Sequence, residues 1–488
     1  MAPTRRSLHI ALVEAPIKEP RRPSLALGYL AAILRGEGHS VAIHDINARL
    51  YHAGPGETRD LWEHFSHWVM ERPENTAAFM RDNRSVIDPL LAAIAQDDPD
   101  IIGLSVLLTQ RPLSIAVANA LRAIAPRAVI VFGGPECFPM FNPAGFAESG
   151  GPGYAVIGEG EETIREFARR LAAGDDPLCP GVMRIAGGTA ISGGPRAMIR
   201  SLDEIPFPDW EGFPLDLYRE PGRFSIMMTR GCVNRCVFCM EPEMWSRFRI
   251  RSPGHVAAEI AHLAARHGTT SVEFNDSVIN GSPQHLVDLC NLLVTRGPKV
   301  SWGAQAVVAR TLDDRLCARL KAAGCGCLSF GVESGSDAVL ALMGKRFTVT
   351  EASAALRACA GAGIATSVNI MCGFPGEMED DFALTLSFLE RNRAAITWVN
   401  PADAFTGIVP GTRLHREHER FGVRFVGSLT FWETVDGTNT FLVRMERFER
   451  LLRHLRALGL DALYPGLEYQ NRAAWIDAFY RNREAAAR

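Results

Sequence analysis

The chain has 488 residues, of which 47% are hydrophobic, and its 52 basic and 55 acidic residues leave a formal net charge of −3. At about 150 residues per domain, this length predicts about three units with ordinary buried cores. The near-neutral charge provides no global attraction to nucleic acid or to an anionic membrane, so neither is expected as a partner. No window approaches the roughly 18 uninterrupted apolar residues that a membrane-spanning helix needs.

The cysteines and the first residues indicate the cellular compartment. Glu14 and Pro16 interrupt the apolar run near the start, and no small-residue cleavage site follows, so no export signal is recognisable. The eleven cysteines are an odd number, which argues against a disulfide framework and favours thiol or metal chemistry. We therefore expect a cytoplasmic protein.

Residues 1–200 predict an α/β unit built on a doubly wound, Rossmann-like parallel sheet, because short apolar runs alternate with helical patterns. The predicted strands are 8–15, 40–45, 100–106, 128–134 and the start of 154–162, and helices are predicted at 25–38 and 113–125. Such sheets bind ligands at the carboxyl ends of their strands. The insertion 47–98, rich in aromatic residues, is predicted to form a helical cap or a lid over a cofactor or substrate.

The rest of the chain predicts a linker, a second α/β unit and a tail. Residues 201–222 hold four prolines and no sustained period, which is typical of a linker. Six strands then alternate with helices over 223–415, which predicts a complete or partial (β/α) barrel with its chemistry at the carboxyl face. Residues 416–488 carry no clear motif and are predicted to form a small, mainly helical region related to the substrate.

Cys232, Cys236 and Cys239 follow directly on the first strand of this predicted barrel. Three thiolates on one tight loop can ligate three irons of a cubane and leave the fourth iron open. A structural zinc ion is the lesser alternative, because it would need a fourth ligand and none stands beside the triplet. The sequence therefore predicts a [4Fe-4S] cluster held by these cysteines.

The CxxxCxxC loop at 232–239 resembles that of the radical S-adenosylmethionine (SAM) superfamily, and the similarity extends over about 220–412, through GVESGS at 331–336 and NIMCGFPGE at 369–377. The resemblance implies that the open iron binds SAM and that one electron, from a donor such as flavodoxin or ferredoxin, cleaves it to methionine and a 5′-deoxyadenosyl radical. The SAM contacts that the resemblance implies are Phe238, Glu333, Ser334, Ile370, Gly373 and Pro375.

Several of these residues also allow a structural interpretation. Glu333 could be an ion-pair partner, and the glycines and proline of 373–376 could simply turn the chain after a strand. Glu273 and Asp276, at the end of the predicted second barrel strand, are expected to contact SAM or the substrate. The remaining cysteines of this half, including Cys372, are predicted to be core thiols.

The first half resembles the cobalamin-binding domain that precedes the radical SAM barrel in one branch of the superfamily. The similarity lies in 23–45, 101–110, 131–139 and 154–164. Glycines at two strand ends would let the backbone approach a bulky, phosphate-bearing ligand. The predicted cobalamin contacts are Leu27, Ser105, Val106, Gln110, Gly133, Gly134, Pro135, Gly158, Glu159 and Gly160. An empty docking domain is the alternative.

No DxHxxG string is present, so cobalamin would be bound without a histidine lower ligand from the protein, with its lower face against residues 105–111. This departure favours methyl transfer over radical generation from adenosylcobalamin. Methylthiotransferases carry three cysteines for a second cluster in their first domain, whereas only Cys137 and Cys179 precede the triplet here. That activity is therefore nearly excluded.

The leading hypothesis is a cobalamin-dependent radical SAM methyltransferase that methylates an unactivated carbon of a small molecule or a peptide. An alternative with the same cofactors is oxidative cyclisation or rearrangement without methyl transfer. A non-catalytic sensor of cluster or cobalamin is less favoured, because the chain is nearly neutral and shows no helix-turn-helix candidate.

Overall fold

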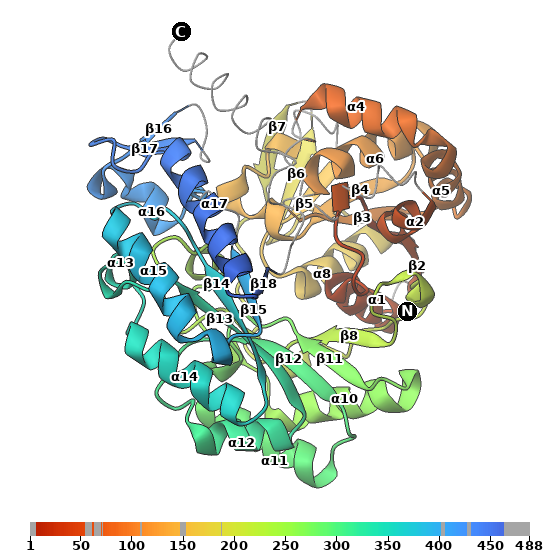
Figure 1. Ribbon diagram of the computed structural model, residues 1–488. Helices are drawn as coiled ribbons and strands as arrows, with labels where there is room; N and C mark the ends of the chain where they lie inside the picture. Colours follow the sequence, from red (N-terminus) through yellow and green to blue (C-terminus); the bar gives the residue numbers. More distant parts are fainter. Residues whose placement is uncertain are drawn as a thin grey trace. The chain divides into compact units, whose positions relative to one another are not determined.

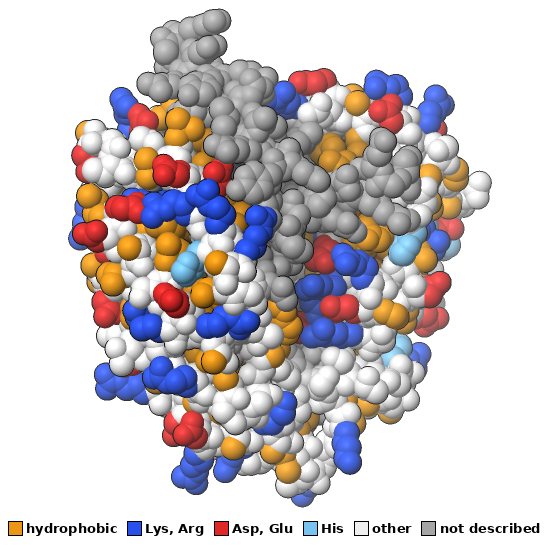
Figure 2. All heavy atoms as spheres, viewed as in Figure 1, with side chains coloured by type: hydrophobic (Ala, Val, Ile, Leu, Met, Phe, Trp, Pro, Cys, Tyr) orange, Lys and Arg blue, Asp and Glu red, His pale blue; other side chains and the backbone are white. Residues whose placement is uncertain are grey.

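The computed structural model describes residues 6–53, 61–62, 70, 72–107, 110–146, 153–186, 188–401, 406–426 and 431–462. The chain divides into two compact units, residues 1–225 and 226–488 (Figure 1). Each unit is built around a seven-stranded sheet. Among the described residues, no helix is long and apolar enough to cross a membrane. On the face drawn in Figure 2, acidic and basic side chains are scattered among neutral ones, in keeping with the near-neutral net charge.

The sheet of the first unit has the strand order β2-β1-β3-β4-β5-β6-β7. Its strands are β1 (His9–Glu14), β2 (Ser40–Asp45), β3 (Ile101–Ser105), β4 (Val129–Gly133), β5 (Gly153–Val156), β6 (Val182–Ala186) and β7 (Thr189–Ser192). The first five strands pair in parallel, which confirms the predicted doubly wound sheet. The last two strands pair antiparallel and form a hairpin edge that the sequence did not predict.

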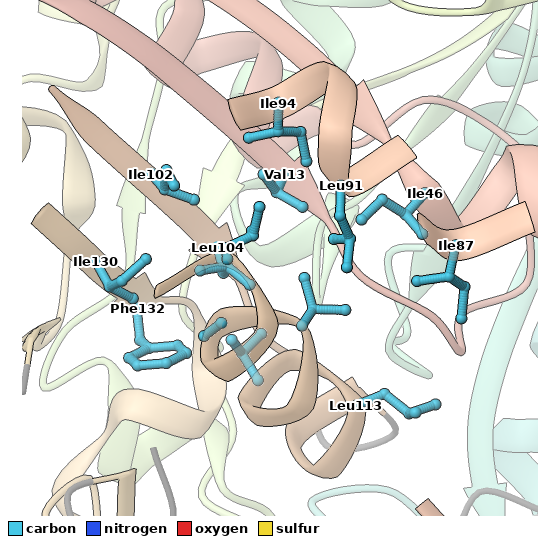
Figure 3. Packing of buried hydrophobic residues seen from close by; sticks show 14 of the residues in the cluster. Val13, Ile46, Ile87, Leu91, Ile94, Ile102, Leu104, Leu113, Ile130 and Phe132 are labelled. Atoms are coloured by element: carbon cyan, nitrogen blue, oxygen red, sulfur yellow. The ribbon is translucent and has the colours of Figure 1, made fainter. Parts of the chain in front are cut away.

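The helices that cover this first sheet are α1 (Leu25–Gly36), α2 (Ile46–Ala53), α4 (Pro73–Asp82), α5 (Arg84–Gln96), α6 (Arg111–Ile124) and α8 (Gly160–Ala172). Of these, α2, α4, α5 and α6 share one apolar core with the sheet (Figure 3). Ile87, Leu91 and Ile94 of α5 belong to the same buried cluster as Val13 and Leu104 of the strands. The described part of the insertion 47–98 is therefore helical and contributes to the core of the unit.

Residues 201–222, predicted as a linker, pack as an ordered part of the first unit. Trp210 is buried and lies 5.1 Å, centroid to centroid, from Phe224. Its ring lies so close to Gly28 on α1 that a Cβ there would stand 3.0 Å from it. The hydroxyl of Tyr218 donates a hydrogen bond of 2.6 Å to the buried Asp45. Aromatic side chains thus anchor a segment that its prolines keep out of regular structure.

The sheet of the second unit has the order β18-β15-β14-β13-β12-β11-β8 and does not close on itself. Its strands are β8 (Arg223–Ile226), β11 (Ser271–Phe274), β12 (Ser301–Ala306), β13 (Cys325–Glu333), β14 (Ala365–Ile370), β15 (Trp398–Pro401) and β18 (Asp461–Ala462). The register from β11 through β18 is parallel. The prediction of a partial barrel is confirmed, and β18, from the C-terminal region, adds a strand to the six that were expected.

The connecting helices of the second unit are α10 (Pro253–His267), α11 (Pro283–Arg296), α12 (Asp314–Ala322), α13 (Asp337–Leu342), α14 (Val349–Gly361) and α15 (Glu379–Arg391). Local signals explain where they begin. Ser252 accepts a hydrogen bond from the backbone N–H of His255 at the start of α10, and Thr348 with Glu351 forms a capping box on α14. The C-terminal region adds β16 (Val423–Phe425), β17 (Trp432–Thr434) and α17 (Phe441–Ala457).

Candidate functional site

The three cysteines of the triplet lie on one loop of the second unit. This loop runs from β9 (Thr229–Arg230), which pairs with β10 (Arg249–Ile250), to the short helix α9 (Glu241–Met244). Gly231 opens it with a φ of 83°, and a Cβ there would stand 3.0 Å from the carbonyl oxygen of Arg247. Only glycine fits such a position without strain. The loop then turns tightly, since Cys239 donates a backbone hydrogen bond of 3.2 Å to Cys236.

The thiols of Cys232, Cys236 and Cys239 are all partly buried, and burial raises the pKa of each, that of Cys239 to about 12. Lys345 acts in the opposite direction on Cys232 and Cys236. Among the described residues, no three His, Cys, Asp or Glu side chains gather around a single metal position. A cubane binds each thiolate through a separate iron, so three soft sulfur donors spread over one loop fit it better than a mononuclear zinc site.

Glu333 lies at the end of β13 in a left-handed conformation with a φ of 73°, which is unusual for a residue other than glycine. Its carboxylate accepts from Lys345 Nζ at 3.2 Å, and both side chains are less than a tenth exposed. Burial alone would lower the pKa of Lys345, but Glu333 and the nearby thiols outweigh it and raise the pKa. Glu333 is therefore held in an ion pair beside the cysteine loop.

Lys345 is a site residue that the sequence did not reveal. Its ammonium donates to the carbonyl oxygen of Gly331 at 2.7 Å. It also lies 5.5 Å from the ring centroid of Phe238, the residue just before Cys239 in the cysteine loop. The segment around it is tied to the same loop, because Val237 donates to the carbonyl oxygen of Met343 at 3.0 Å. A buried cation thus stands where thiolates and carboxylates meet.

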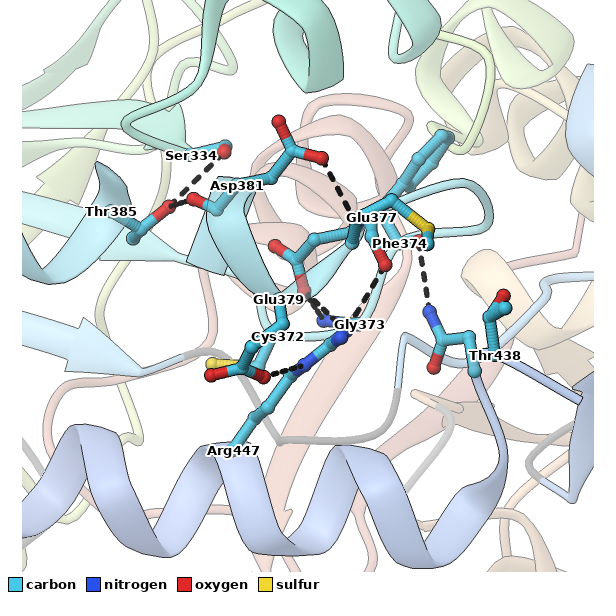
Figure 4. Close-up of polar contacts among 12 residues, drawn as sticks. Ser334, Cys372, Gly373, Phe374, Glu377, Glu379, Asp381, Thr385, Thr438 and Arg447 are labelled. Carbon is cyan, nitrogen blue, oxygen red and sulfur yellow. Dashed lines mark hydrogen bonds and ion pairs between the residues drawn. The ribbon is translucent and has the colours of Figure 1, made fainter. Parts of the chain in front are cut away.

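Ile370 ends β14, and Met371 after it donates a backbone hydrogen bond of 2.9 Å to Glu333. The following loop, residues 371–377, contains Gly373 with a φ of 77°, whose N–H donates to Glu377 at 2.6 Å (Figure 4). Glu377 is fully buried, and burial raises its pKa to about 7. Phe374, next to Pro375, lies edge-on to Phe238 at 6.3 Å. The loop therefore adjoins the cysteine loop.

Two of the predicted site residues are already hydrogen-bonded within the fold. Asp276 is fully buried, which raises its pKa to about 7, and it accepts from the backbone N–H groups of Met228 and Thr229. Ser334, also fully buried, shares a hydrogen bond of 3.2 Å with Thr385 on α15 (Figure 4). Both residues brace the strand ends that lead into the site. Glu273, by contrast, lies over Gly303 of β12.

In the first unit, the predicted cobalamin residues lie at the carboxyl ends of β3 and β4 and near α8. Val106, beyond Ser105, donates to the carbonyl oxygen of Gly133 at 2.7 Å. Gly134 has a φ of 102°, and a Cβ there would stand 2.7 Å from the carbonyl oxygen of Val106. Because two strand ends approach each other so closely here, only glycine fits at position 134, which Pro135 follows. An approach of the backbone to a ligand would be a second reason for this glycine.

Gln110 and Leu27 are buried in the interior of the first unit. The Gln110 amide donates to Glu14 and to the carbonyl oxygen of Ala15, each at 2.6 Å, and its oxygen accepts from Leu107. Its side chain is therefore committed to bracing the end of β1. Glu159 similarly accepts from the N–H of Ile199 at 2.7 Å.

Room for a ligand is found at two of the predicted glycines. A Cβ at Gly158, with a φ of 84°, would meet nothing within 4 Å, and one at Gly133 would approach only Val156, at 3.9 Å. Gly160 opens α8, but Glu161 and Glu162 in the first turn already place negative charge at this N-terminus, which does not favour a phosphate there. The open backbone at Gly133 and Gly158 fits a bulky ligand such as cobalamin better than the buried side chains of the same prediction do.

Residues 226–389 match the family model of the radical SAM superfamily, and residues 75–168 match that of the B12 binding domain. The chain therefore contains a radical SAM domain and a B12 binding domain. The predicted cofactors, a [4Fe-4S] cluster, SAM and cobalamin, are thereby confirmed at the level of the domains. The individual contact residues remain predictions, and residues 390–488 lie outside both matches.

Curated relatives are similar over much of the chain. "Uncharacterized methyltransferase PH0819" of Pyrococcus horikoshii is 27% identical over 80% of this chain and 77% of its own length. The "anaerobic magnesium-protoporphyrin IX monomethyl ester cyclase" of Cereibacter sphaeroides is 26% identical over 60% of this chain and 49% of its own length. "Cytidylyl-2-hydroxyethylphosphonate methyltransferase" of Streptomyces wedmorensis is 23% identical over 65% of this chain and 62% of its own length. The chain thus spans between half and three quarters of these relatives.

Solved structures share the whole fold. TsrM, a radical SAM methyltransferase from Kitasatospora setae solved with cobalamin and a [4Fe-4S] cluster, covers 99% of this chain with a TM-score of 0.67 and 18% identity. OxsB, a cobalamin-dependent radical SAM enzyme solved with aqua-cobalamin, covers 93% with a TM-score of 0.64 and 19% identity, over 62% of its own chain. At these identities, the similarity establishes the fold.

Proposed function

We propose that this protein is a cobalamin-dependent radical SAM methyltransferase that methylates an unactivated carbon of a small molecule or a peptide. The observation that carries the proposal is the pairing of a B12-binding sheet with a radical SAM barrel along one chain, as in TsrM, which covers 99% of it. Among the relatives described above, the Pyrococcus protein matches the largest share of this chain, 80%, and its name also describes a methyltransferase.

The described residues support this chemistry in the second unit. When bound, a cluster with SAM supplies an electron-driven radical, and cobalamin supplies a methyl carrier. Cys232, Cys236 and Cys239 would hold the cluster by their thiolates. Lys345 offsets the negative charge that these thiolates and Glu333 place in a buried region. The edge-to-face pair of Phe238 and Phe374 provides an apolar wall that excludes water from the neighbouring loop.

In the first unit, the open backbone at Gly133 and Gly158 would receive the cobalamin. We further propose that a flavodoxin or ferredoxin supplies the electrons. A small-molecule substrate is supported by TsrM, which was also solved with tryptophan as its substrate. All eleven cysteines are free thiols, which suits the reducing cytoplasm that we propose as the location.

Oxidative cyclisation is the second candidate, favoured by the two cyclases among the relatives, at 26% and 25% identity. This chain covers only 49% and 65% of those cyclases, against 77% of the Pyrococcus protein. Methyl transfer is therefore the better supported of the two.

The proposal is tested with the full chain, reconstituted anaerobically with iron, sulfide and cobalamin. SAM carrying a deuterated methyl group is supplied with a chemical reductant and a panel of small molecules and peptides, and products are followed by mass spectrometry. We expect one labelled methyl group in the product for each S-adenosylhomocysteine and each 5′-deoxyadenosine formed. An unlabelled, cyclised product without S-adenosylhomocysteine would contradict methyl transfer and support the second candidate.

A further inference from the structure

We propose that residues 406–426 and 431–457, here called the C-terminal clamp, hold the SAM site in shape, and that Arg447 is a positioning residue for the loop 371–377. The inference rests on the proposed function in one respect, namely that this loop contacts SAM. The clamp lies beyond residue 389, where the radical SAM match ends, and no role in cofactor binding was predicted for it.

The strongest contact runs from α17 to the loop (Figure 4). Arg447 reaches Glu377 and donates 3.2 Å hydrogen bonds to both its carboxylate and its carbonyl oxygen. The two side chains are 4% and 0% exposed, so the pair is desolvated. Arg447 also donates to Glu379 at 3.4 Å, but that carboxylate is 55% exposed, so Glu377 is the buried partner of Arg447. Glu377 in turn accepts from the N–H of Gly373. The position of the Gly373 peptide is thus linked through one carboxylate to a helix 70 residues further along the chain.

Two further contacts hold the same loop from the clamp. Asn439, fully buried before α17, donates to the carbonyl oxygen of Phe374 at 3.0 Å. Thr406 donates to the carbonyl oxygen of Cys372 at 3.1 Å, and Trp432 donates to that of Thr406 at 2.7 Å. Three consecutive residues, 372–374, are therefore held through their backbone groups.

Arg444, one turn before Arg447 on α17, packs between Trp432 and Gly373 of the loop. Its guanidinium stacks 3.8 Å from the ring centroid of Trp432, and its aliphatic stem lies against Gly373 so closely that a Cβ on this glycine would clash with it. Gly373 is therefore required both by its left-handed φ and by the helix that packs on it.

The clamp also reaches the cysteine loop. Leu414 donates a backbone hydrogen bond of 2.7 Å to the carbonyl oxygen of Val237, which lies between Cys236 and Cys239. Val237, Phe374, Leu414 and Trp432 belong to one buried cluster, which joins the cysteine loop, the loop 371–377 and the clamp. Both predicted SAM-binding loops thus share a core that the C-terminal region completes.

Arg450 provides a matched control for Arg447. It lies on the same helix and pairs at 2.6 Å with Glu379, the carboxylate that Arg447 also reaches at 3.4 Å. Among the described residues, however, Arg450 forms no ion pair with the buried Glu377, and its side chain and that of Glu379 are 33% and 55% exposed. Exposed pairs contribute little, because water screens them and competes for them. A contrast between the two arginines therefore separates a buried positioning contact from a general effect of charge on α17.

The test compares Arg447→Met, Arg447→Lys and Arg450→Met in the full chain with a reconstituted cluster, at pH 8, where Glu377 is ionised. SAM affinity is measured by calorimetry, alongside iron content and thermal unfolding. We expect Arg447→Met to bind SAM about tenfold more weakly, the loss of roughly one buried charged hydrogen bond, with iron content retained. Arg447→Lys should recover part of the affinity, and Arg450→Met should bind as the wild type does.

A double variant keeps the test decisive if Arg447→Met alone does not fold. Glu377→Gln retains an oxygen that can accept from Gly373, and Arg447→Met combined with it leaves no buried charge unpaired. We expect this double variant to bind SAM more tightly than Arg447→Met does or, if that single variant does not fold, to fold and bind SAM. Effects of the two changes that simply add would contradict the coupling.

Equal SAM affinity in Arg447→Met and the wild type would overturn the inference while leaving the proposed function intact. A wild-type protein that holds the cluster but does not bind SAM would overturn both. Loss of iron without loss of SAM affinity in the cluster-bearing fraction would also count against the inference, because it would place the effect of Arg447 at the cysteine loop alone.

Discussion

The carboxyl edges of the two sheets are stabilised in different ways. In the second unit, buried ion pairs hold the loops: Glu333 with Lys345, Glu377 with Arg447, and Arg251 with Glu259 at 2.5 Å. In the first unit, the buried Glu14 and Glu136 pair with Lys18 and Arg111 at 3.4 and 3.3 Å, but these cations are 26% and 22% exposed. Backbone contacts of Val106 and Gly134 and the neutral amide of Gln110 complete this edge. The edge of the second unit thus relies on ion pairs with both partners buried, whereas that of the first relies on half-solvated cations and on backbone and amide groups.

The largest expected effect is at the cysteine triplet. Changing Cys232, Cys236 or Cys239 to alanine removes one of three cluster ligands, so iron binding and reductive cleavage of SAM should be lost. Cys290→Ala, in the buried core of α11, is the matched control. It should keep the iron and cost about 1–2 kcal/mol of stability, as small core truncations do. Iron analysis and quantification of 5′-deoxyadenosine check this, and a triplet variant with full iron content would contradict the cluster assignment.

The next effect tests the charge compensation of the second unit. Lys345→Met leaves Glu333 buried without its cation and is expected to destabilise this unit by about 3–5 kcal/mol. Lys345→Met combined with Glu333→Gln should recover most of that loss. Hydrogen exchange resolved by mass spectrometry reports each unit separately, which matters because a chain of two units need not unfold in one step. An equal loss in the single and double variants would show that the charges are not coupled.

The pH dependence of stability should follow Glu377. Its pKa is raised from 4.5 to about 7, so between these values the folded state holds a proton that the unfolded state releases. Stability therefore falls as pH rises from about 4.5 to 7 and levels off above, by at most about 3 kcal/mol for a shift of this size. Glu377→Gln should flatten that part of the curve, measured by denaturant unfolding at several pH values. An unchanged slope would remove Glu377 as its cause.

The smallest effect belongs to the first unit. Gln110→Ala removes the donors to Glu14 and Ala15 and should cost about 1–3 kcal/mol, confined to the exchange of residues in the first sheet. Iron content should not change. If the same substitution destabilised the second unit equally, the contrast between the two edges would not hold.

The sequence revealed what local patterns encode. The alternation of apolar runs and helical stretches predicted both sheets, and cysteines within eight residues predicted the cluster loop. Lys345 and Arg447 escaped prediction because their partners lie 12 and 70 residues away, and no period or spacing links such positions. Asp276, Ser334 and Gln110 were placed at the correct strand ends, but a sequence does not show that a polar atom is already bonded inside the fold.

Methyl transfer by this protein requires that bound cobalamin reacts with SAM. The most direct test is the yield of S-adenosylhomocysteine from the full chain with a reconstituted cluster, supplied with SAM and a chemical reductant, with and without bound cobalamin and without a substrate. We expect about one equivalent per bound cobalamin and none without it, because each cobalamin accepts one methyl group. A protein that holds both cofactors and yields no S-adenosylhomocysteine would contradict methyl transfer.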